Sequence, residues 1–334
     1  MVKEKGFFRG RALSATVAAL VTATACTDIG EREPNQAQRV REGEQEKREK
    51  QRAVRRDKQE RAQPSQRQQS DRQLARAKIP GETFRFAVVG DFGEGNRAER
   101  RVANAIEDWV EDTGAEALVT TGDNIYPDGD PKYFEEAWRE PYGWVKEEGV
   151  EIAASLGNHD VEGGEAEEVM DLLEIPRPWY RERVGDVELF VLDGNRVGDP
   201  RQTQWLRDAL QGSDGGWQIA VSHQPAFSCS KHGSTPGVVR EWVPLFEKNG
   251  VDLVLNGHDH SYQRFVSEGV TYVVTGGGGA ELYGLRACDD GHPDRIEGED
   301  EEHHFVGVFG SSKVLRVAAI DEDGDVIDIA TLRR

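Results

Sequence analysis

From residue 84 onward, short apolar runs alternate with longer amphipathic segments, and this alternation restricts the folds that the chain can adopt. Phe84–Val89 is a mostly apolar run closed by Gly90, which is typical of a strand buried on both faces. We predict further strands at 117–121, 151–156, 187–192, 218–222, 251–255 and 271–275. Helices are predicted at 96–110, 133–144, 165–173, 201–210 and 238–249. After Phe305 the pattern is all-strand, with a hairpin turn at 321–325. The predicted class is α/β, with two sheets flanked by helices.

The charge and the length of the apolar runs exclude some classes of function. The 334 residues contain 42 Lys and Arg against 62 Asp and Glu, a net charge of -20. Such a charge repels phosphate backbones, so nucleic acid is not expected as a partner. No apolar run reaches the roughly 18 residues of a spanning helix, which excludes a multi-span membrane protein.

The first 79 residues differ from the rest in composition. Residues 1–26 resemble a secretory signal, with four basic residues in 1–11 and an uncharged stretch at 12–25. The stretch ends in Ala-Thr-Ala-Cys, and Cys26 resembles the lipid-modified residue of bacterial lipoproteins; an ordinary cleaved signal is the alternative. Residues 27–79 contain almost no large apolar side chains and are predicted to be a disordered or single-helix tether. The folded domain is expected at 80–334, outside the cytoplasm, secreted or attached to the membrane only through Cys26.

Five predicted strands end in residues whose side chains bind metals. Gly90-Asp91 follows the first strand, Gly122-Asp123 the second and Gly157-Asn158-His159 the third, while His223 and Gly257-His258-Asp259-His260 follow two later strands. Ligand sites in α/β sheets lie beyond the carboxyl ends of strands, so these five loops are expected to meet. Glycine beside a ligand lets the backbone turn sharply and approach an ion closely.

The order and spacing of these motifs resemble the metallophosphoesterase (calcineurin-like) superfamily. Most members carry Asp-Xaa-His in the first motif, whereas here Gly93 takes the place of that His. Tyr126, three residues after Asp123, is similar to a feature of the purple and tartrate-resistant acid phosphatase branch. The resemblance implies a four-layer α-β-β-α sandwich of two mixed sheets.

The resemblance also implies two metal ions and their ligands. The first ion would be held by Asp91, Asp123, Tyr126 and His260, and the second by Asp123, Asn158, His223 and His258, with Asp123 bridging. Two carboxylates and a phenolate suit Fe(III), whereas an amide and two imidazoles suit a divalent ion such as Fe, Zn or Mn. Such a pair activates a water or hydroxide and stabilises an in-line displacement at phosphorus.

Two further histidines are implied to act on the substrate. His159 matches the residue of the family that contacts substrate together with Asn158 and is proposed to protonate the leaving oxygen. His232 resembles a second substrate-contacting histidine of the small family members; an ordinary loop histidine is the alternative. Asp160 and Asp259 are candidates for orienting neighbouring imidazoles.

Three weaker signals have alternative interpretations. Cys229 and Cys288 are predicted to form a disulfide, as an exported protein permits, and two free thiols are the alternative. The Gly-rich run 276–279 favours backbone packing near the metals over a phosphate cradle. The acidic segment 289–304, with His292, His303 and His304, is expected to be a solvated loop, with a third metal site as the alternative.

The sequence therefore predicts a phosphatase that hydrolyses small phosphomonoesters outside the membrane. A phosphodiesterase or nucleotidase on the same metal site is the first alternative. A catalytically inactive surface binding protein is the second.

Overall fold

The computed structural model describes residues 65–289 and 291–334. The predicted signal peptide (1–26), with Cys26, and residues 27–64 of the predicted tether lie outside the described residues.

The first of two sheets joins the first three strands of the domain to its last three. Its strand order is β13-β12-β11-β1-β2-β3. The three early strands are parallel, with Phe86 opposite Ala117 and Ala117 opposite Glu151, while the late strands form an antiparallel meander that pairs with β1. The bounds are β1 (Phe84–Val89), β2 (Ala117–Thr120), β3 (Glu151–Ala154), β11 (His304–Ser311), β12 (Val314–Asp321) and β13 (Val326–Arg333).

The second sheet has the order β10-β8-β9-β7-β6-β5-β4. Its four central strands are parallel and its outer strands antiparallel. The bounds are β4 (Tyr180–Val184), β5 (Val187–Val191), β6 (Trp217–Val221), β7 (Leu253–Asn256), β8 (Tyr262–Ser267), β9 (Val270–Thr275) and β10 (Arg295–Glu299). Both sheets are therefore mixed, as predicted.

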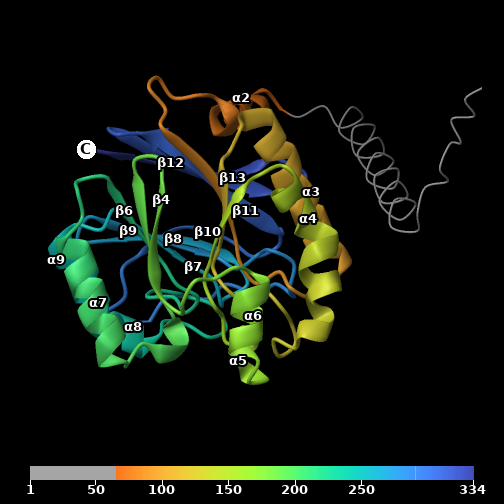
Figure 1. Cartoon of the computed structure of the whole chain (residues 1–334). Coiled ribbons are helices and arrows are strands. Elements are labelled where there is room, and N and C mark those ends of the chain that lie inside the picture. Colours follow the sequence, from red (N-terminus) through yellow and green to blue (C-terminus); the bar gives the residue numbers. More distant parts are fainter. Residues whose placement is uncertain (1–64, 290) are drawn as a thin grey trace, which may run out of the picture. The chain divides into compact units, whose positions relative to one another are not determined.

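Helices cover the outer face of each sheet (Figure 1). On the first sheet lie α3 (Arg97–Thr113) and α4 (Glu140–Glu147); on the second lie α7 (Pro200–Gln211), α8 (Pro236–Glu241) and α9 (Val243–Asn249). One apolar core fills the space between the sheets and beneath α3 and α4, and another lies between the second sheet and α7–α9. Short helices occupy connecting loops: η1 (Pro131–Tyr133), α5 (His159–Glu162), α6 (Ala166–Leu172) and η3 (Gly194–Arg196). The four-layer α/β sandwich is confirmed.

Two predicted helices are broken in the structure. The helix predicted at 133–144 consists of η1, a π-helical turn η2 (Glu135–Arg139) and α4. The helix predicted at 238–249 divides at Trp242 into α8 and α9, because Pro244 has no amide hydrogen to continue the helical bonds.

Three strands were not predicted, and the reason differs among them. β4 and β10 are edge strands with exposed charged residues in their middle, so they carry no apolar pattern. β8 begins two residues after His260, and its sequence Tyr-Gln-Arg-Phe-Val-Ser mixes polar and apolar residues on faces that are both mostly buried. The last of these strands, β10, lies within the segment expected to be a solvated loop.

The domain also begins earlier than the predicted boundary at residue 80. Helix α2 (Gln66–Arg76) packs on the domain: Ala75 and Ile79 are buried, and the Trp109 indole donates to the Ala75 carbonyl at 3.3 Å. Arg72 pairs with Asp325 at 2.7 Å. The segment 65–79 therefore belongs to the folded domain. Its two buried apolar residues, Ala75 and Ile79, are too few to stand out in a polar sequence. None of the helices that the structure describes is long and apolar enough to cross a bilayer.

Candidate metal centre

The five motif-bearing loops meet at one edge of the sandwich. They follow β1, β2 and β3 of the first sheet and β6 and β7 of the second. Because these strands are parallel within each sheet, their carboxyl ends lie on the same side, as the motif positions predict.

The backbone is strained where three of these loops begin. Asp91, Asp123 and His258 adopt φ angles of 57°, 54° and 70°, the left-handed region that residues other than glycine rarely occupy. Each follows a glycine at a strand end. Strain of this kind costs on the order of 1–3 kcal/mol per residue and marks functional sites when the surrounding structure maintains it.

Two glycines allow the loops to approach each other closely. A Cβ atom on Gly157 would lie 2.0 Å from Asp123 Oδ1, and one on Gly257 would lie 2.3 Å from Asp91 Oδ2. Any side chain at either position would displace a carboxylate. Glycine is therefore required here by the carboxylates themselves.

The first group of side chains surrounds Asp91 and Asp123. His260 Nε2 lies 3.4 Å from Asp91 Oδ1 and 3.3 Å from the Tyr126 hydroxyl, which donates to Asp123 Oδ2 at 2.9 Å. Both carboxylates are buried. These are the four residues predicted to hold the first ion.

The second group surrounds the ring of His223. Its Nε2 atom lies 3.3 Å from Asp123 Oδ2, 3.0 Å from Asn158 Oδ1 and 3.2 Å from His258 Nδ1. These are the residues predicted to hold the second ion, and Asp123 belongs to both groups. The structure thus brings all seven predicted ligands together; ligand atoms of Asp91, Asp123 and His223 all lie within 4.8 Å of one another.

This donor set fits a pair of cations better than it fits protons. Burial lowers the pKa of His223, but Asp123 and Asp91 outweigh that effect and raise it to about 9. Burial, with His223 and His232 nearby, lowers the pKa of His258 to about 3. One proton on His223 Nε2 faces three acceptors at once, and a single N–H bond cannot satisfy all of them. A cation among them can.

Main-chain carbonyls orient two of the imidazoles. His223 Nδ1 lies 2.9 Å from the Thr121 carbonyl and His260 Nδ1 lies 2.6 Å from the Glu281 carbonyl. Carbonyl oxygens only accept, so Nδ1 carries a hydrogen in both rings, and Nε2 is the atom that can exchange its proton for a cation at the site. This arrangement is typical of metal-binding histidines.

Asp160 and Asp259, the candidates for orienting imidazoles, accept hydrogen bonds from main-chain amides and so stabilise the loops. Asp160 is buried and accepts from the amides of Asn124, Ile125 and Gly157 at 2.8–3.0 Å. Burial and the neighbouring Asp123 raise the pKa of Asp160 to about 6.

Asp259, also buried, accepts from the His232 and Gly233 amides at 2.8 and 3.0 Å and from the Ser228 hydroxyl at 2.5 Å. Asp259 therefore fixes the loop 228–233 beside His258 and His260, its neighbours in sequence.

The two predicted substrate histidines lie on different sides of the centre. His159 packs its ring on Tyr126 at 4.4 Å, its amide donates to Asp123 Oδ1 at 2.9 Å, and its Nδ1 contacts the Pro127 carbonyl. His232 packs on the ring of His258 at 4.3 Å. Tyr283 was not predicted as a site residue; it stacks on His260 at 4.0 Å and an interplanar angle of 13°. No sequence motif marks it, because its position depends on a loop after β9.

The weaker sequence signals have clear outcomes. Cys229 and Cys288 form the predicted disulfide, with Cα atoms 4.8 Å apart. The run 276–279 packs as backbone against the centre: Gly278 donates to the Gly90 carbonyl, and a Cβ on Gly276 would lie 2.9 Å from Asp91 Oδ2. His292 bonds Ser234, His303 lies near the Gly277 carbonyl and His304 is buried in β11, so these three histidines are separately engaged. Among the described residues, they do not belong to a group able to share an ion.

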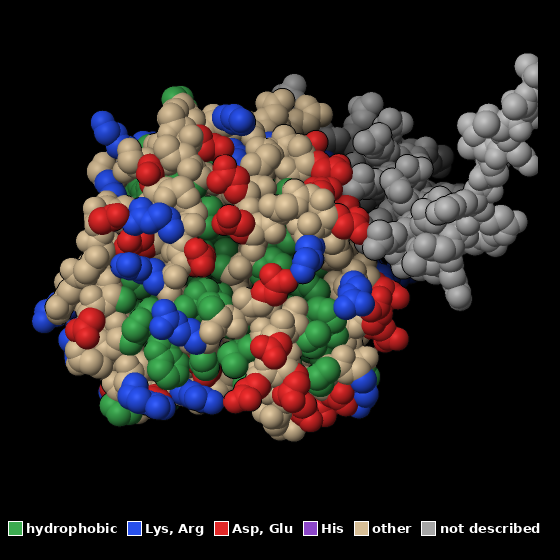
Figure 2. Space-filling view, viewed as in Figure 1, with side chains coloured by type: hydrophobic (Ala, Val, Ile, Leu, Met, Phe, Trp, Pro, Cys, Tyr) green, Lys and Arg blue, Asp and Glu red, His purple; other side chains and the backbone are tan. Residues whose placement is uncertain are grey.

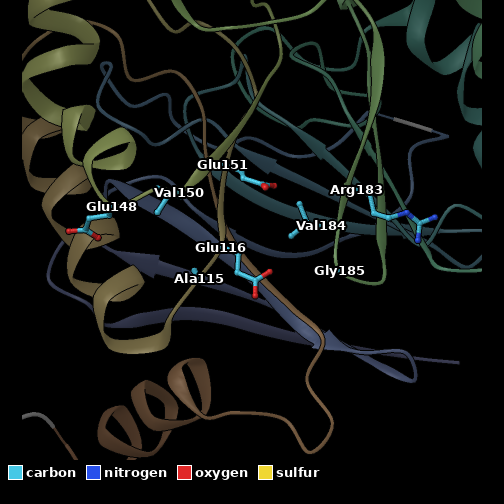
Figure 3. A pocket seen from close by; sticks show the side chains of 9 residues that line it. Ala115, Glu116, Glu148, Val150, Glu151, Arg183, Val184 and Gly185 are labelled. Atoms are coloured by element: carbon cyan, nitrogen blue, oxygen red, sulfur yellow. The ribbon is translucent and has the colours of Figure 1, made fainter.

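A hollow of about 480 Å³ lies at the opposite edge of the sheets, where the parallel strands begin (Figure 3). Its charged lining residues are Glu116, Glu148, Glu151 and Arg183. Acidic and basic side chains are interspersed over the face shown in Figure 2. The hollow is separate from the metal centre and contains none of the predicted site residues.

Comparison with known proteins agrees with this geometry. The sequence pattern of the family described as calcineurin-like phosphoesterase matches residues 84–262, more than half of the chain. The chain belongs to the calcineurin-like phosphoesterases. Tartrate-resistant acid phosphatase type 5 of Rattus norvegicus is 30% identical over 246 residues, which cover 61% of this chain and 75% of that protein. Purple acid phosphatase 17 of Arabidopsis thaliana is 31% identical over 230 residues, covering 58% and 68%. The predicted enzyme class, a phosphoric ester hydrolase similar to acid phosphatases, is confirmed.

Solved structures show the same fold. Purple acid phosphatase PPD1 from yellow lupin superposes with a TM-score of 0.64 at 18% identity, covering 77% of this chain and 55% of that one. GAP50, described as the anchor in the inner membrane complex of Plasmodium, gives a TM-score of 0.66 at 16% identity, covering 75% and 89%.

Proposed function

We propose that this calcineurin-like phosphoesterase is a binuclear metal-dependent phosphomonoesterase. The observation that carries the proposal is the convergence of seven lone-pair donors, Asp91, Asp123, Tyr126, Asn158, His223, His258 and His260, around the shared carboxylate of Asp123. When bound, two cations supply a lowered pKa for water and stabilisation of the charge that develops at phosphorus. The chain itself supplies the strained, buried frame that holds the donors in place.

His159 is proposed to donate the proton to the leaving oxygen. Its Nδ1 faces the Pro127 carbonyl and therefore carries a hydrogen, which leaves Nε2 to take up and release the transferred proton. The hydrogen bond from the His159 main-chain amide to Asp123 Oδ1 fixes His159 beside the shared ligand. In the variant His159→Asn, we expect kcat to fall about 100-fold for an alkyl phosphate and far less for 4-nitrophenyl phosphate, which needs no protonation. An equal fall for both esters would contradict the role.

His232 and Asn158 are proposed to contact the phosphoryl oxygens. His232 is exposed at the mouth of the centre, and the loop that carries it is fixed by Asp259. Asn158 directs its amide oxygen into the cluster, so its NH₂ group is available to donate elsewhere.

The metals are proposed to be Fe(III) with a divalent Fe, Zn or Mn ion. Asp91, Asp123 and Tyr126 give the first group anionic oxygen donors, which suit a hard trivalent ion. Phenolate bound to Fe(III) absorbs visible light, so the full-length protein should be coloured. Tyr126→Phe should abolish the band; a variant that kept it would contradict the assignment of Tyr126.

The decisive test of the reaction is a comparison of esters. We expect kcat/KM for phenyl phosphate to exceed that for diphenyl phosphate by at least tenfold. A preference for the diester would favour phosphodiesterase or nucleotidase activity on the same centre. Absence of both activities with both metals bound would favour a binding protein.

The protein is proposed to act outside the cytoplasm, with a signal peptide at 1–26 and a tether that ends before α2. The disulfide between Cys229 and Cys288 supports an oxidising compartment. Cys26→Ser should release the protein from a washed membrane fraction if Cys26 carries a lipid.

A further inference from the structure

Tyr283 connects the metal centre to a cation at its mouth. Its ring stacks on His260 at 4.0 Å, and the amino group of Lys231 lies 3.9 Å from the centre of the same ring. His232 meets the ring edge-on at 5.5 Å. The two distances from the tyrosine ring place the Lys231 amino group within about 8 Å of the His260 ring, which is about the Debye length at physiological salt.

The loop that carries Lys231 is held at several points. Asp259 binds the amides of His232 and Gly233, and the Ser230 hydroxyl donates to the Gly284 carbonyl at 3.1 Å. The disulfide joins Cys229 to Cys288, and the Arg286 amide donates to the Cys229 carbonyl at 2.9 Å. Lys231 therefore extends from a braced backbone, although its own side chain is exposed.

Lysine is rare in this domain, and Lys231 is one of its few lysines. Residues 80–334 contain 23 Lys and Arg, of which only five are Lys, against 51 Asp and Glu. Lys132 is paired with Asp130, and Lys146 with Glu174 at 2.6 Å. Among the described residues, no carboxylate pairs with Lys231; its contact is the face of Tyr283. An ammonium group on an aromatic face can still bind an anion.

We propose that Lys231 selects phosphate esters that carry a second anionic group near the phosphate. The inference rests on the proposed phosphomonoesterase function and specifies its substrate class. The phosphoryl group lies against the metal ligands, and a carboxylate or second phosphate on the alcohol reaches the Lys231 amino group across the Tyr283 ring. The Arg286 guanidinium lies beside Gly233, so Lys231 is one of two cations at this loop. In a domain this acidic, a doubly anionic ester is otherwise repelled, so the Lys231 charge changes its binding more than it changes that of a simple ester.

A matched pair of esters tests the inference on the metal-loaded, full-length protein. Glycerol 3-phosphate and 3-phosphoglycerate differ by one carboxylate. We expect kcat/KM to favour 3-phosphoglycerate, and the preference to fall about fivefold in Lys231→Gln, the upper range for an exposed charge pair. Lys231→Arg should restore it. Lys313→Gln removes the same charge in the turn between β11 and β12 at the opposite edge and should leave the preference unchanged.

The two proposals fail in different ways. If the protein hydrolyses both esters but Lys231→Gln leaves their ratio unchanged, the role of Lys231 is overturned and the phosphatase function stands. If neither ester is hydrolysed, phenyl phosphate decides whether the phosphatase function itself fails, and calorimetric titration with phosphonoacetate and ethylphosphonate tests Lys231 without turnover. A ratio of dissociation constants that falls about fivefold in Lys231→Gln supports the proposal, and an unchanged ratio overturns it.

Discussion

The two edges of the sandwich carry similar residue types in opposite settings. Where the parallel strands end, Asp91, Asp123 and His223 are buried and bound to one another across loops. Where the same strands begin, Glu116, Glu148 and Glu151 line an open hollow and are exposed to solvent. At the first edge, folding has already removed the carboxylates from water before any ligand arrives, whereas at the second edge the carboxylates remain exposed.

The backbone shows the same contrast. At the metal edge Asp91, Asp123 and His258 adopt left-handed φ angles, and adjacent glycines make room for the carboxylates. At the hollow, Gly149 and Gly185 also have positive φ, but the residues of other types next to them do not. The two edges therefore differ in the burial of their acidic residues and in the backbone strain beside them.

The largest expected effect is that of Asp123→Asn. Asp123 is shared by both groups of ligands, so the variant should lose metal from both positions. Even residues that only orient ligands contribute 10–100-fold to activity, so we expect kcat/KM for phenyl phosphate to fall by more than about 100-fold. Circular dichroism would establish that the variant is folded. Activity within tenfold of the wild type would contradict the binuclear account.

Asp160→Asn sharpens the comparison, because it perturbs the metal edge without touching a ligand atom. The variant loses charge-assisted bonds to the amides of Asn124, Ile125 and Gly157, which hold the loops of Asp123 and Asn158. We expect metal affinity, measured by competition with a chelator, to fall about 10–100-fold. An unchanged affinity in a folded variant would show that the loops hold their geometry unaided.

The pH dependence of the free energy of unfolding tests whether the buried histidine beside the metal edge stays neutral. His304 packs beneath Gly277 and is buried; burial lowers its pKa to about 4. The unfolded chain binds that proton near pH 6.5, so the free energy of unfolding should fall with pH below 6.5 and level off below 4. Between pH 7 and 5 the difference between wild type and His304→Gln should change by about 2 kcal/mol, measured by urea unfolding. A constant difference would mean that His304 is solvated.

Glu148→Gln should have the smallest effect. Glu148 is exposed at the edge of the hollow, so the free energy of unfolding should change by no more than about 0.5 kcal/mol and kcat/KM by no more than about twofold. A loss of metal or of activity in this variant would remove the distinction between the two edges.

Much of this site could be predicted from sequence because ligand position follows from strand ends. Asp91, Asp123 and Asn158 each follow a glycine after a buried strand, and parallel strands bring such residues together without knowledge of the packing. The same logic located His223, His258 and His260. The alternation of strand and helix likewise indicated two sheets with outer helices.

The rest depends on contacts that sequence patterns do not encode. Tyr283 reaches His260 through a loop whose path is set by the disulfide and by Ser230. Asp160 and Asp259 bind main-chain amides instead of imidazoles, because the folded loops place those amides within hydrogen-bond distance. The segment 65–79 docks through Ala75 in α2 and Ile79 after it, and two apolar residues are too few to produce an amphipathic pattern.

Metal analysis of the purified full-length protein tests the central claim most directly. Plasma mass spectrometry of wild type and Asp123→Asn, purified without chelator, gives the number of ions per chain. The account predicts two ions in the wild type, one of them iron, and fewer than one in the variant. One ion or none in an active wild-type protein, or two ions retained by Asp123→Asn, would contradict it.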